Sequence, residues 1–263
     1  MYLLDKFNNK YIIKGILRAE APIHIGTGEM DFSPTAVDNS VIKDEDGNPF
    51  IPGSSLKGVL RSFMERLFNS GIFEEYRSCN VFDRNSEMKM KQCISDGEVE
   101  IIKQKYKDDS RKEEKIATDI YKKQCDVCKL FGGHYFSSKL NISDATLIGE
   151  KAYIYQRDGV AIDRDTLTAA DKKKYTFEAV AAGTEFKFEM TIDNLEEEHI
   201  NLLKIMFNFL QEGEMKVGGK TSAGLGNVKL ISKSIYLINK DNMREYFVNG
   251  INDSNKGTLE VNL

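Results

Sequence analysis

The chain has 263 residues, of which 41% are apolar and 30% charged, a composition that supports a folded core beneath a polar surface. Its formal net charge is -4, from 37 basic and 41 acidic residues, so the chain as a whole does not attract nucleic acid. Any RNA contact must therefore come from a local basic surface. No apolar run approaches the roughly 20 residues of a membrane-spanning helix, and the N-terminus does not resemble a signal peptide, so we expect a cytoplasmic protein without membrane contact.

The chain opens with a predicted strand and a long loop. Residues 11–19 alternate between apolar and polar side chains, the pattern of a strand. Residues 21–46 are rich in Gly, Pro, Ser, Thr, Asp and Asn and predict an irregular loop, which at this length tends to serve a function. The loop carries His24, Asp31 and Asp38. A carboxylate beside bound RNA could hold a divalent ion, but an aspartate in such a loop usually makes turn hydrogen bonds, so these residues alone do not indicate catalysis.

A motif of two prolines, a glycine, two serines and a lysine lies within residues 48–61. The prolines hold the chain extended, and Ser54 or Ser55 can then cap the amphipathic helix that follows. Free amides at the helix start, the two hydroxyls, and the cations of Lys57 and Arg61 one turn apart together predict a site for phosphate. A capped helix with ordinary surface cations is the alternative interpretation.

Residues 72–140 predict an insertion that contains all four cysteines, Cys79, Cys93, Cys125 and Cys128. The last two form a C-x-x-C pair, the spacing that lets two thiolates bind one tetrahedral ion. Because such a polar insertion has little core, we expect a structural zinc ion to fold it, with His134 as the reserve ligand. A redox dithiol is disfavoured because the pair does not open a βαβ unit.

The second half of the chain completes a recognisable order of elements. We predict strands at residues 144–148, 176–179, 185–192 and 227–237, an excursion at 153–174, and a second helix at 196–210. The polar tail after residue 240 is expected to be loosely held. Without the insertions the order is strand, helix, strand, strand, helix, strand, which is the split βαβ arrangement of a ferredoxin-like or RNA-recognition-type α+β fold.

A glycine-rich loop, residues 217–226, precedes the last strand and holds four glycines beside Lys220, Thr221 and Ser222. It can present backbone amides and hydroxyls to a phosphate. Its spacing is not that of a Walker loop, and it leads into a strand instead of a helix. We favour a loop that binds a nucleic-acid backbone over a simple flexible turn.

Several motifs, taken together and in order, resemble the RAMP superfamily, and in particular the backbone subunits of type III CRISPR-Cas effector complexes. The resemblance covers most of residues 11–235, and the charged segment 98–123 and the tail after residue 240 lie outside it. The motifs that carry it are residues 24–26, Asp38, and residues 48–58, 125–132, 158–164 and 218–226.

This resemblance implies a single RAMP domain over residues 1–263, with an RNA-recognition-type palm, a zinc-bearing finger region at 72–140 and a thumb hairpin at 153–175. It implies that copies of the chain stack along a guide RNA with other effector subunits, and that each thumb displaces one nucleotide in six of the guide–target duplex. The guide would be contacted by His24, by residues of the motif at 48–61 and by residues of the glycine-rich loop. The residues of the first motif are Ser54, Ser55, Lys57 and Arg61, and those of the loop are Gly218, Gly219, Lys220, Thr221 and Ser222.

Members of this family use an aspartate in the loop after the first strand for metal-dependent cleavage of target RNA. Asp38 fits that place, because a short apolar segment follows it and leads to the proline-glycine-serine-serine run. Asp31 is the alternative. The resemblance thus implies an endoribonuclease that uses Mg²⁺ or Mn²⁺ and cuts at six-nucleotide intervals.

Three other functions stay open. One is a purely structural backbone subunit without nuclease activity, because a single loop carboxylate is thin evidence for catalysis. Another is a stand-alone endonuclease that processes guide precursors, which needs a catalytic histidine near the binding motifs, where His24 is the one candidate. The third, a ferredoxin-like protein for a small ligand, explains neither binding motif.

Overall fold

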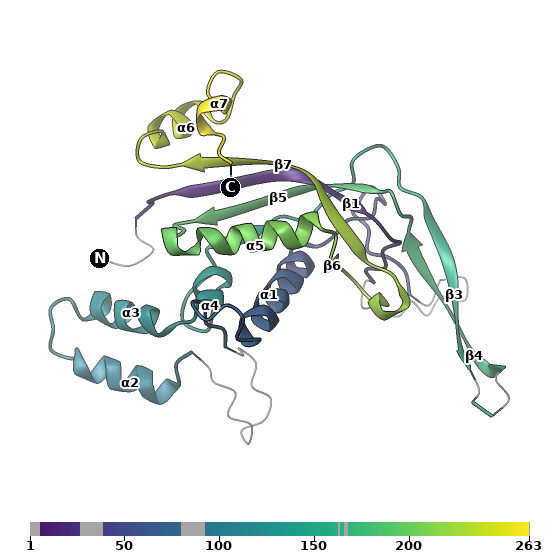
Figure 1. Ribbon diagram of the computed structural model, residues 1–263, viewed down its shortest axis with the longest axis horizontal. Helices are drawn as coiled ribbons and strands as arrows, with labels where there is room; N and C mark the ends of the chain where they lie inside the picture. The colour runs from purple at the N-terminus through teal and green to yellow at the C-terminus, as the bar shows by residue number, and fades with distance from the viewer. Residues whose placement is uncertain (1–5, 27–38, 80–92, 163, 166–167, 263) are drawn as a thin grey trace.

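A computed structural model describes residues 6–26, 39–79, 93–162, 164–165 and 168–262. Its centre is an antiparallel sheet with the strand order β2-β5-β1-β7-β6 (Figure 1). The five strands are β1 (Lys10–Ala19), β2 (Leu140–Ile142), β5 (Glu185–Asp193), β6 (Met215–Lys216) and β7 (Asn227–Ile238).

The strands predicted at residues 11–19, 185–192 and 227–237 are confirmed, and they occupy the middle of the sheet. β1 pairs with β5 and with β7, both antiparallel, so that Gly15 lies opposite Phe188 on one side and Lys233 on the other. Without the short β6, the order β2-β5-β1-β7 is that of the predicted split βαβ arrangement.

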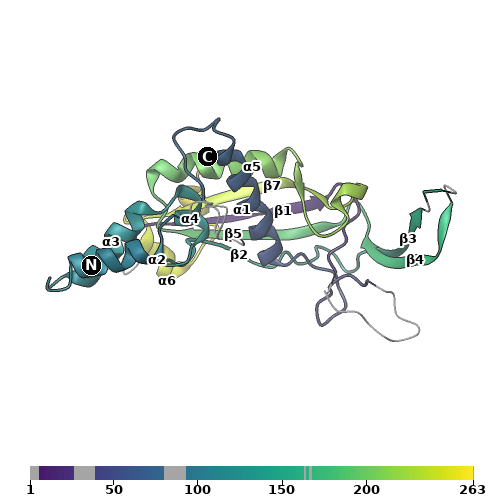
Figure 2. The ribbon, with the colours of Figure 1, turned by 90° about the horizontal axis from the view of Figure 1, so that it is seen from below.

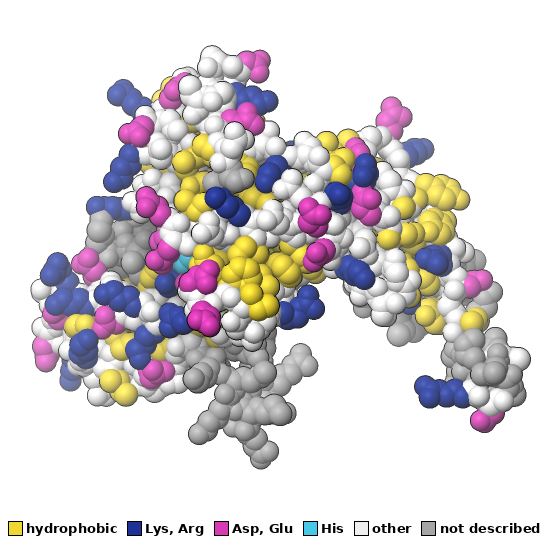
Figure 3. Space-filling model, viewed as in Figure 1, with side chains coloured by type: hydrophobic (Ala, Val, Ile, Leu, Met, Phe, Trp, Pro, Cys, Tyr) yellow, Lys and Arg dark blue, Asp and Glu magenta, His cyan; other side chains and the backbone are white. Residues whose placement is uncertain are grey.

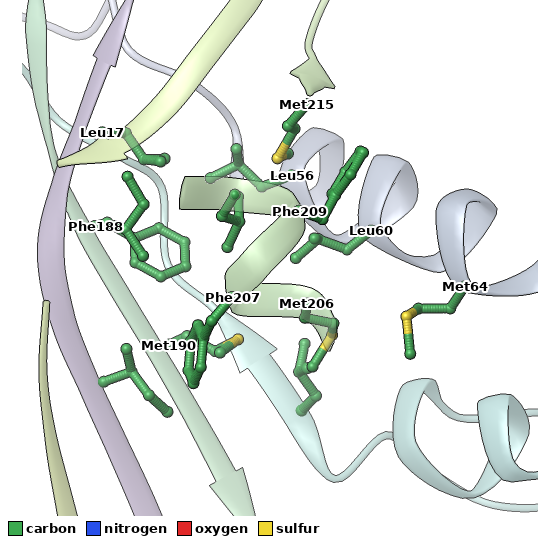
Figure 4. Close-up of a cluster of buried hydrophobic side chains, with 14 of the residues drawn as sticks. Leu17, Leu56, Leu60, Met64, Phe188, Met190, Met206, Phe207, Phe209 and Met215 are labelled. Atoms are coloured by element: carbon green, nitrogen blue, oxygen red, sulfur yellow. The ribbon is translucent and has the colours of Figure 1, made fainter. Parts of the chain in front are cut away.

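Two helices cover one face of the sheet, α1 (Gly53–Asn69) and α5 (Ile200–Gln211), the second preceded by a 3₁₀ turn, η1 (Glu197–His199). Both predicted helices are therefore confirmed. Their apolar stripes meet each other and the sheet in the main core, which Figure 4 shows with Leu56 and Leu60 facing Phe188 and Phe207. The rings of Phe63 and Phe209 stack at 3.7 Å and 9° where the two helices touch.

In its described residues, the insertion between α1 and β2 contains three helices, α2 (Asp96–Lys105), α3 (Lys112–Lys123) and α4 (Asp126–Phe131). A capping box between Ser95 and Glu98 starts α2, which explains why this charged segment is helical. The first two helices share a small apolar core that includes Val99 and Ile120. The insertion therefore has more core than its polar sequence indicates, although α2 and α3 lie away from the sheet (Figures 1 and 2).

A two-stranded hairpin, β3 (Ile154–Ile162) and β4 (Ala169–Val180), corresponds to the predicted excursion. It projects from the end of the central sheet in both views (Figures 1 and 2). Its base is held by mutual backbone hydrogen bonds between Ile23 and Val180 at 2.8 and 2.9 Å.

Two expectations about this part of the fold are wrong. The strand expected at residues 144–148 is not a continuous strand, because Ala145 and Leu147 make only isolated bridges to Ile51 and Phe186. The tail is also not loosely held: α6 (Met243–Asn249) and α7 (Lys256–Leu259) pack on the face of the sheet opposite α1 and α5. Their contact is an apolar cluster in which Leu259 is fully buried with Ile12, Tyr236 and Ile238.

In the part of the chain that the structure describes, no helix is both long enough and apolar enough to cross a membrane.

The start of α1 differs from the expected serine cap. Pro52 occupies the cap position, and the first helical amide, that of Gly53, donates to Oδ1 of Asp144 at 2.7 Å. Gly53 also has no space for a side chain, because an added Cβ would lie 2.2 Å from the Ile142 carbonyl oxygen. The helix start is therefore closed by a carboxylate from the chain segment after β2.

We predict that Asp144→Ala lowers the free energy of unfolding by about 1 kcal/mol, the usual loss for a removed N-cap acceptor. Ser54→Ala, at the position expected to cap, should change it by less than about 0.5 kcal/mol, as an exposed side chain does. Urea unfolding of the two variants measures both values. A larger loss in Ser54→Ala than in Asp144→Ala would contradict this description of the helix start.

Candidate nucleic-acid interface and metal centre

A groove of about 410 Å³ lies between α1 and the glycine-rich loop. Of the ten residues predicted to contact RNA, Gly218 and Thr221 line it, and those predicted on α1 do not. From α1 it is lined by Gly58, Ser62 and Arg66, which recur every four residues and so share one face of the helix. From the loop side it is lined by Lys216, Gly218 and Thr221, together with Glu214; Val59 and Phe209 complete it. Sequence reasoning missed Ser62, Arg66 and Lys216, although the small–polar–basic spacing after Gly58 is a signal that could have found the first two.

The glycine-rich loop is held against the start of the long loop at His24. The Gly219 amide donates to the His24 carbonyl oxygen at 2.8 Å. Gly218 has a φ of +80°, and a Cβ there would lie 2.2 Å from the same oxygen, so only glycine fits. The next turn of the loop is a short 3₁₀ helix, η2 (Thr221–Ala223).

His24 itself supports the loop from inside. Its side chain is buried, with 7% of the residue exposed. Nδ1 lies 2.8 Å from the Glu178 carbonyl oxygen, so this nitrogen carries the proton, and the ring lies edge-on to Phe177 at 5.3 Å. The geometry gives His24 a positioning role at the base of the hairpin, with little surface for direct ligand contact.

Lys220 connects the loop to the hairpin. Its ammonium lies 4.3 Å from the ring centre of Tyr175 and 4.4 Å from that of Phe177, and 3.3 Å from the Tyr175 hydroxyl. Such cation–π contacts hold a lysine in one place without removing its charge. The end of the long loop lies at the same place, because the Asn39 carbonyl oxygen accepts from the Glu178 amide at 2.9 Å. The preceding Asp38, and Asp31, lie outside the described residues.

The four residues predicted to bind phosphate at the start of α1 differ in their exposure and in their contacts. Ser54 is exposed, and Ser55 and Lys57 are half-buried; burial, with the nearby Arg61 charge, lowers the pKa of Lys57. The guanidinium of Arg61 is engaged by three groups: Glu65 at 2.8 Å, the Gly132 carbonyl oxygen at 2.9 Å and Sγ of Cys128 at 3.5 Å. Together with the Asp144 carboxylate on the Gly53 amide, these contacts give the first amide of α1 and the Arg61 guanidinium partners within the chain. The role of the helix start in phosphate binding stays a prediction.

The four cysteines come together at the junction of α1, α4 and the insertion. All four Sγ atoms lie within 4.8 Å of one another, and they are free thiols. Cys93 Sγ lies 3.1 Å from Cys79 Sγ, which is 3.4 Å from Cys128 Sγ. Sulfurs about 2.3 Å from a tetrahedral zinc ion are separated by roughly 3.8 Å, so this cluster needs only a small adjustment to fit one. His134 is exposed at the rim and is not among the four clustered ligands.

Hydrogen bonds within the cluster shift the thiol pKa values apart. Contact with Cys128 lowers the pKa of Cys125 to about 7, and contact with Cys125 lowers that of Cys93. The backbone amides of Cys125 and Cys128 donate to sulfurs as well, at 3.1 and 3.4 Å. Contact with Cys125 raises the pKa values of Cys79 and Cys128. Without an ion the arrangement therefore favours the thiolate, which is the form that binds metal, at Cys93 and Cys125 and the thiol at the other two.

A buried ionic network beside the cluster ties the insertion to the sheet. His199, at the start of α5, lies 3.1 Å from Asp126 through Nε2 and 3.0 Å from Glu196 through Nδ1. Glu196 also accepts from the buried Lys139 at 2.6 Å and from Tyr121. Burial lowers the pKa of His199, but the two carboxylate hydrogen bonds outweigh it, so the net shift is upward and the imidazolium is favoured. Sequence reasoning missed this network because its members come from separate segments of the chain, which only the fold brings together.

A sequence model of the RAMP superfamily matches residues 16–229. The chain is 30% identical over 263 aligned positions to the CRISPR system Cms endoribonuclease Csm3 of Methanocaldococcus jannaschii, covering 96% of this chain and 89% of that protein. Shorter matches, 40% identical over 60 residues and 34% over 84, occur to proteins of the same name from Streptococcus thermophilus and Methanothermobacter thermautotrophicus. The first covers 22% of this chain and 27% of the relative, and the second 29% and 34%.

We predict that His199→Gln lowers the free energy of unfolding by about 3 kcal/mol at pH 6, because it breaks a buried ionic network. The pKa of folded His199 lies above its unfolded value of about 6.5, so its contribution is complete below that pH and is lost as the pH rises through the folded pKa. The gap between the parent and His199→Gln should therefore narrow between pH 6 and pH 9 in urea unfolding. His134→Gln, at an exposed histidine, is the control and should show no gap. A gap of constant size would show that His199 is uncharged in the fold.

Proposed function

The chain belongs to the RAMP superfamily, and from this premise we propose that it is a guide-RNA-binding backbone subunit of a type III CRISPR effector complex that cleaves complementary target RNA. The observation that carries the proposal is the similarity over nearly the whole chain to a relative named as a CRISPR endoribonuclease. The groove between α1 and the glycine-rich loop supports it, because the cations of Arg66 and Lys216 lie there beside Gly218 and Thr221 of the loop.

In this proposal the central sheet with α1 and α5 is the palm, the helical insertion at 72–140 the fingers and the hairpin at 153–175 the thumb. Guide RNA runs along the groove, where it meets Gly218 and Thr221 together with Ser62, Arg66 and Lys216. Its proposed path continues beyond the groove to Ser54, Ser55 and Lys57 at the start of α1 and to Gly219, Lys220 and Ser222 of the loop. His24 holds the loop from below. The projection of the β3–β4 hairpin supports a role in displacing a nucleotide of the guide–target duplex, which would set the six-nucleotide spacing of cleavage.

A chain with a net negative charge can bind RNA in this way if each copy contacts only a few phosphates through a local basic surface. Figure 3 shows Lys and Arg side chains interspersed with Asp and Glu over the face in view, so attraction must be local. Stacked copies on one RNA act as linked sites, whose high effective concentration raises the overall affinity. Other effector subunits and further copies of this chain are therefore the expected partners.

We also propose that Cys79, Cys93, Cys125 and Cys128 hold a structural Zn²⁺. The fit rests on four sulfurs within 4.8 Å of one another and on the amides that donate to them. Thiolate ligands favour zinc over the hard divalent ions. The ion would fasten the segment around Cys79 to α4 and so hold the insertion against α1.

Target cleavage is assigned to Asp38, with Asp31 as the alternative, and to a divalent ion, Mg²⁺ or Mn²⁺. Such an ion, held between a carboxylate and a phosphate, stabilises the charge that develops in the transition state. The support is that Asn39, the next residue, lies beside Phe177 and Glu178 at the thumb base. A guide-processing nuclease is disfavoured, since His24 is buried and His199 lies between carboxylates.

We predict that Lys220→Ala and Lys57→Ala each weaken binding of single-stranded RNA independently of its sequence. Each should reduce the slope of log affinity against log salt by about 0.7, the value for one lost phosphate contact on a single strand. Lys256→Ala, on α7 at the far face of the sheet, is the matched control and should leave the slope unchanged. Parental slopes in both test variants would place the RNA elsewhere.

Elemental analysis of the full chain should give about one zinc per chain, the stoichiometry of one four-ligand site. The double variant Cys125→Ser with Cys128→Ser should lose the metal, and protease should then cut within residues 72–140 while the central sheet stays intact. His134→Gln should keep its zinc. Metal-free protein with unchanged protection of this segment would contradict a structural role for the ion.

Asp38→Ala should abolish divalent-dependent cleavage of target RNA while leaving guide and target binding nearly intact. A loop carboxylate is repelled by phosphates and adds little affinity, so its loss appears in the rate. Product lengths on a denaturing gel, with and without chelator, measure the effect, and Asp31→Ala is the matched control. Loss of cleavage only in Asp31→Ala would move the site along the loop, and parental rates in both variants would favour a structural subunit without nuclease activity.

A further inference from the structure

We propose that Arg61 does not contact RNA but is an outer-shell ligand of the cysteine metal centre, through which that centre holds α1 and the groove in position. The inference rests on the proposed zinc site and changes the role that the sequence suggests for Arg61. It makes RNA affinity depend on metal occupancy at a site that RNA does not touch.

The first support is the geometry of the guanidinium, whose three kinds of donor nitrogen are all used. Nη2 lies 3.5 Å from Sγ of Cys128, and Nη1 donates to the carbonyl oxygen of Gly132 at 2.9 Å. Nε donates to Glu65 one turn further along α1 at 2.8 Å. The side chain is 19% exposed, so an RNA phosphate could reach it only by breaking these contacts.

The second support is charge. Four thiolates around one divalent cation carry a net charge of about -2, because each thiolate contributes one negative charge. Three of the four cysteines are buried, so this charge is poorly solvated and favours a nearby cation. Within the described part of the chain, Arg61 is the side-chain cation that a hydrogen bond places on one of these sulfurs. An N–H donor to a ligand atom is the usual outer-shell contact that strengthens metal binding.

The third support is the position of Arg61 on α1, between the cysteine metal centre and the groove. It follows Gly58 by three residues and precedes Ser62 by one, so the helix that carries it also forms one wall of the groove. The residues that it contacts, Cys128 and Gly132, belong to α4 and its end. A shift of α4 after metal loss would therefore move α1 relative to the glycine-rich loop, which is fastened separately at His24.

The experiment compares Arg61→Gln with Glu65→Gln in the full chain. Both variants lose the ion pair within α1, but only the first loses the contact with Cys128. Zinc affinity, measured by competition with a chromophoric chelator, should fall about 10- to 100-fold in Arg61→Gln, the usual loss for an outer-shell partner. Glu65→Gln should bind zinc like the parent. Arg61→Lys keeps the positive charge but cannot make all three contacts, so its zinc affinity should lie between those of Arg61→Gln and Glu65→Gln. This variant keeps the test informative if Arg61→Gln fails to fold.

RNA binding provides the second measurement. At zinc concentrations that saturate Arg61→Gln, its affinity for single-stranded RNA and its salt slope should return to parental values. A slope lower by about 0.7 at saturating zinc would make Arg61 a phosphate contact and overturn the inference. Parental zinc affinity in Arg61→Gln would also overturn it while leaving the metal site intact, whereas a parent that binds no zinc would refute the metal site itself. RNA binding by the proposed path at the start of α1 and on the glycine-rich loop is tested independently by the Lys57 and Lys220 variants.

Discussion

Packing of α1 and α5 side by side on one face of the sheet is the contact on which the rest of the structure depends. The stacked rings of Phe63 and Phe209 join the two helices, and fully buried leucines such as Leu56 and Leu60 fix the rotation of α1 about its own axis. Burial of these side chains contributes about 1.5–3 kcal/mol each. With one face of α1 fixed in the core, its remaining faces necessarily look toward the glycine-rich loop and toward the cysteine cluster.

The same constraint separates two kinds of charge. Between the insertion and α5, charges are buried and paired, as in the network of His199 with Asp126 and Glu196, and they hold elements together. At the base of the hairpin, in contrast, the ammonium of Lys220 lies over two aromatic rings. Because Asp144 places a carboxylate on the first amide of α1, phosphate binding must depend on side chains and loop amides more than on the helix terminus.

Local sequence patterns predicted the three central strands and the two covering helices, because alternation and helical spacing report burial directly. The cysteine cluster could also be predicted, since thiol chemistry limits what four cysteines in one insertion can do. What could not be predicted depends on distant contacts: Asp144 caps a helix that lies 91 positions away, and Asp126 meets a histidine 73 positions away. The tail was misjudged because its few apolar residues, such as Leu259, find partners only on the far face of the finished sheet.

The central claim is that RNA lies in the groove between α1 and the glycine-rich loop. The most direct measurement is ultraviolet cross-linking of the chain to the RNA that it carries when isolated from its own cells, followed by identification of the cross-linked peptides. The account predicts cross-links within residues 53–66 and 216–225, on RNA of a defined length class. Isolation without RNA, or cross-links confined to α6 and α7 on the far face, would contradict it.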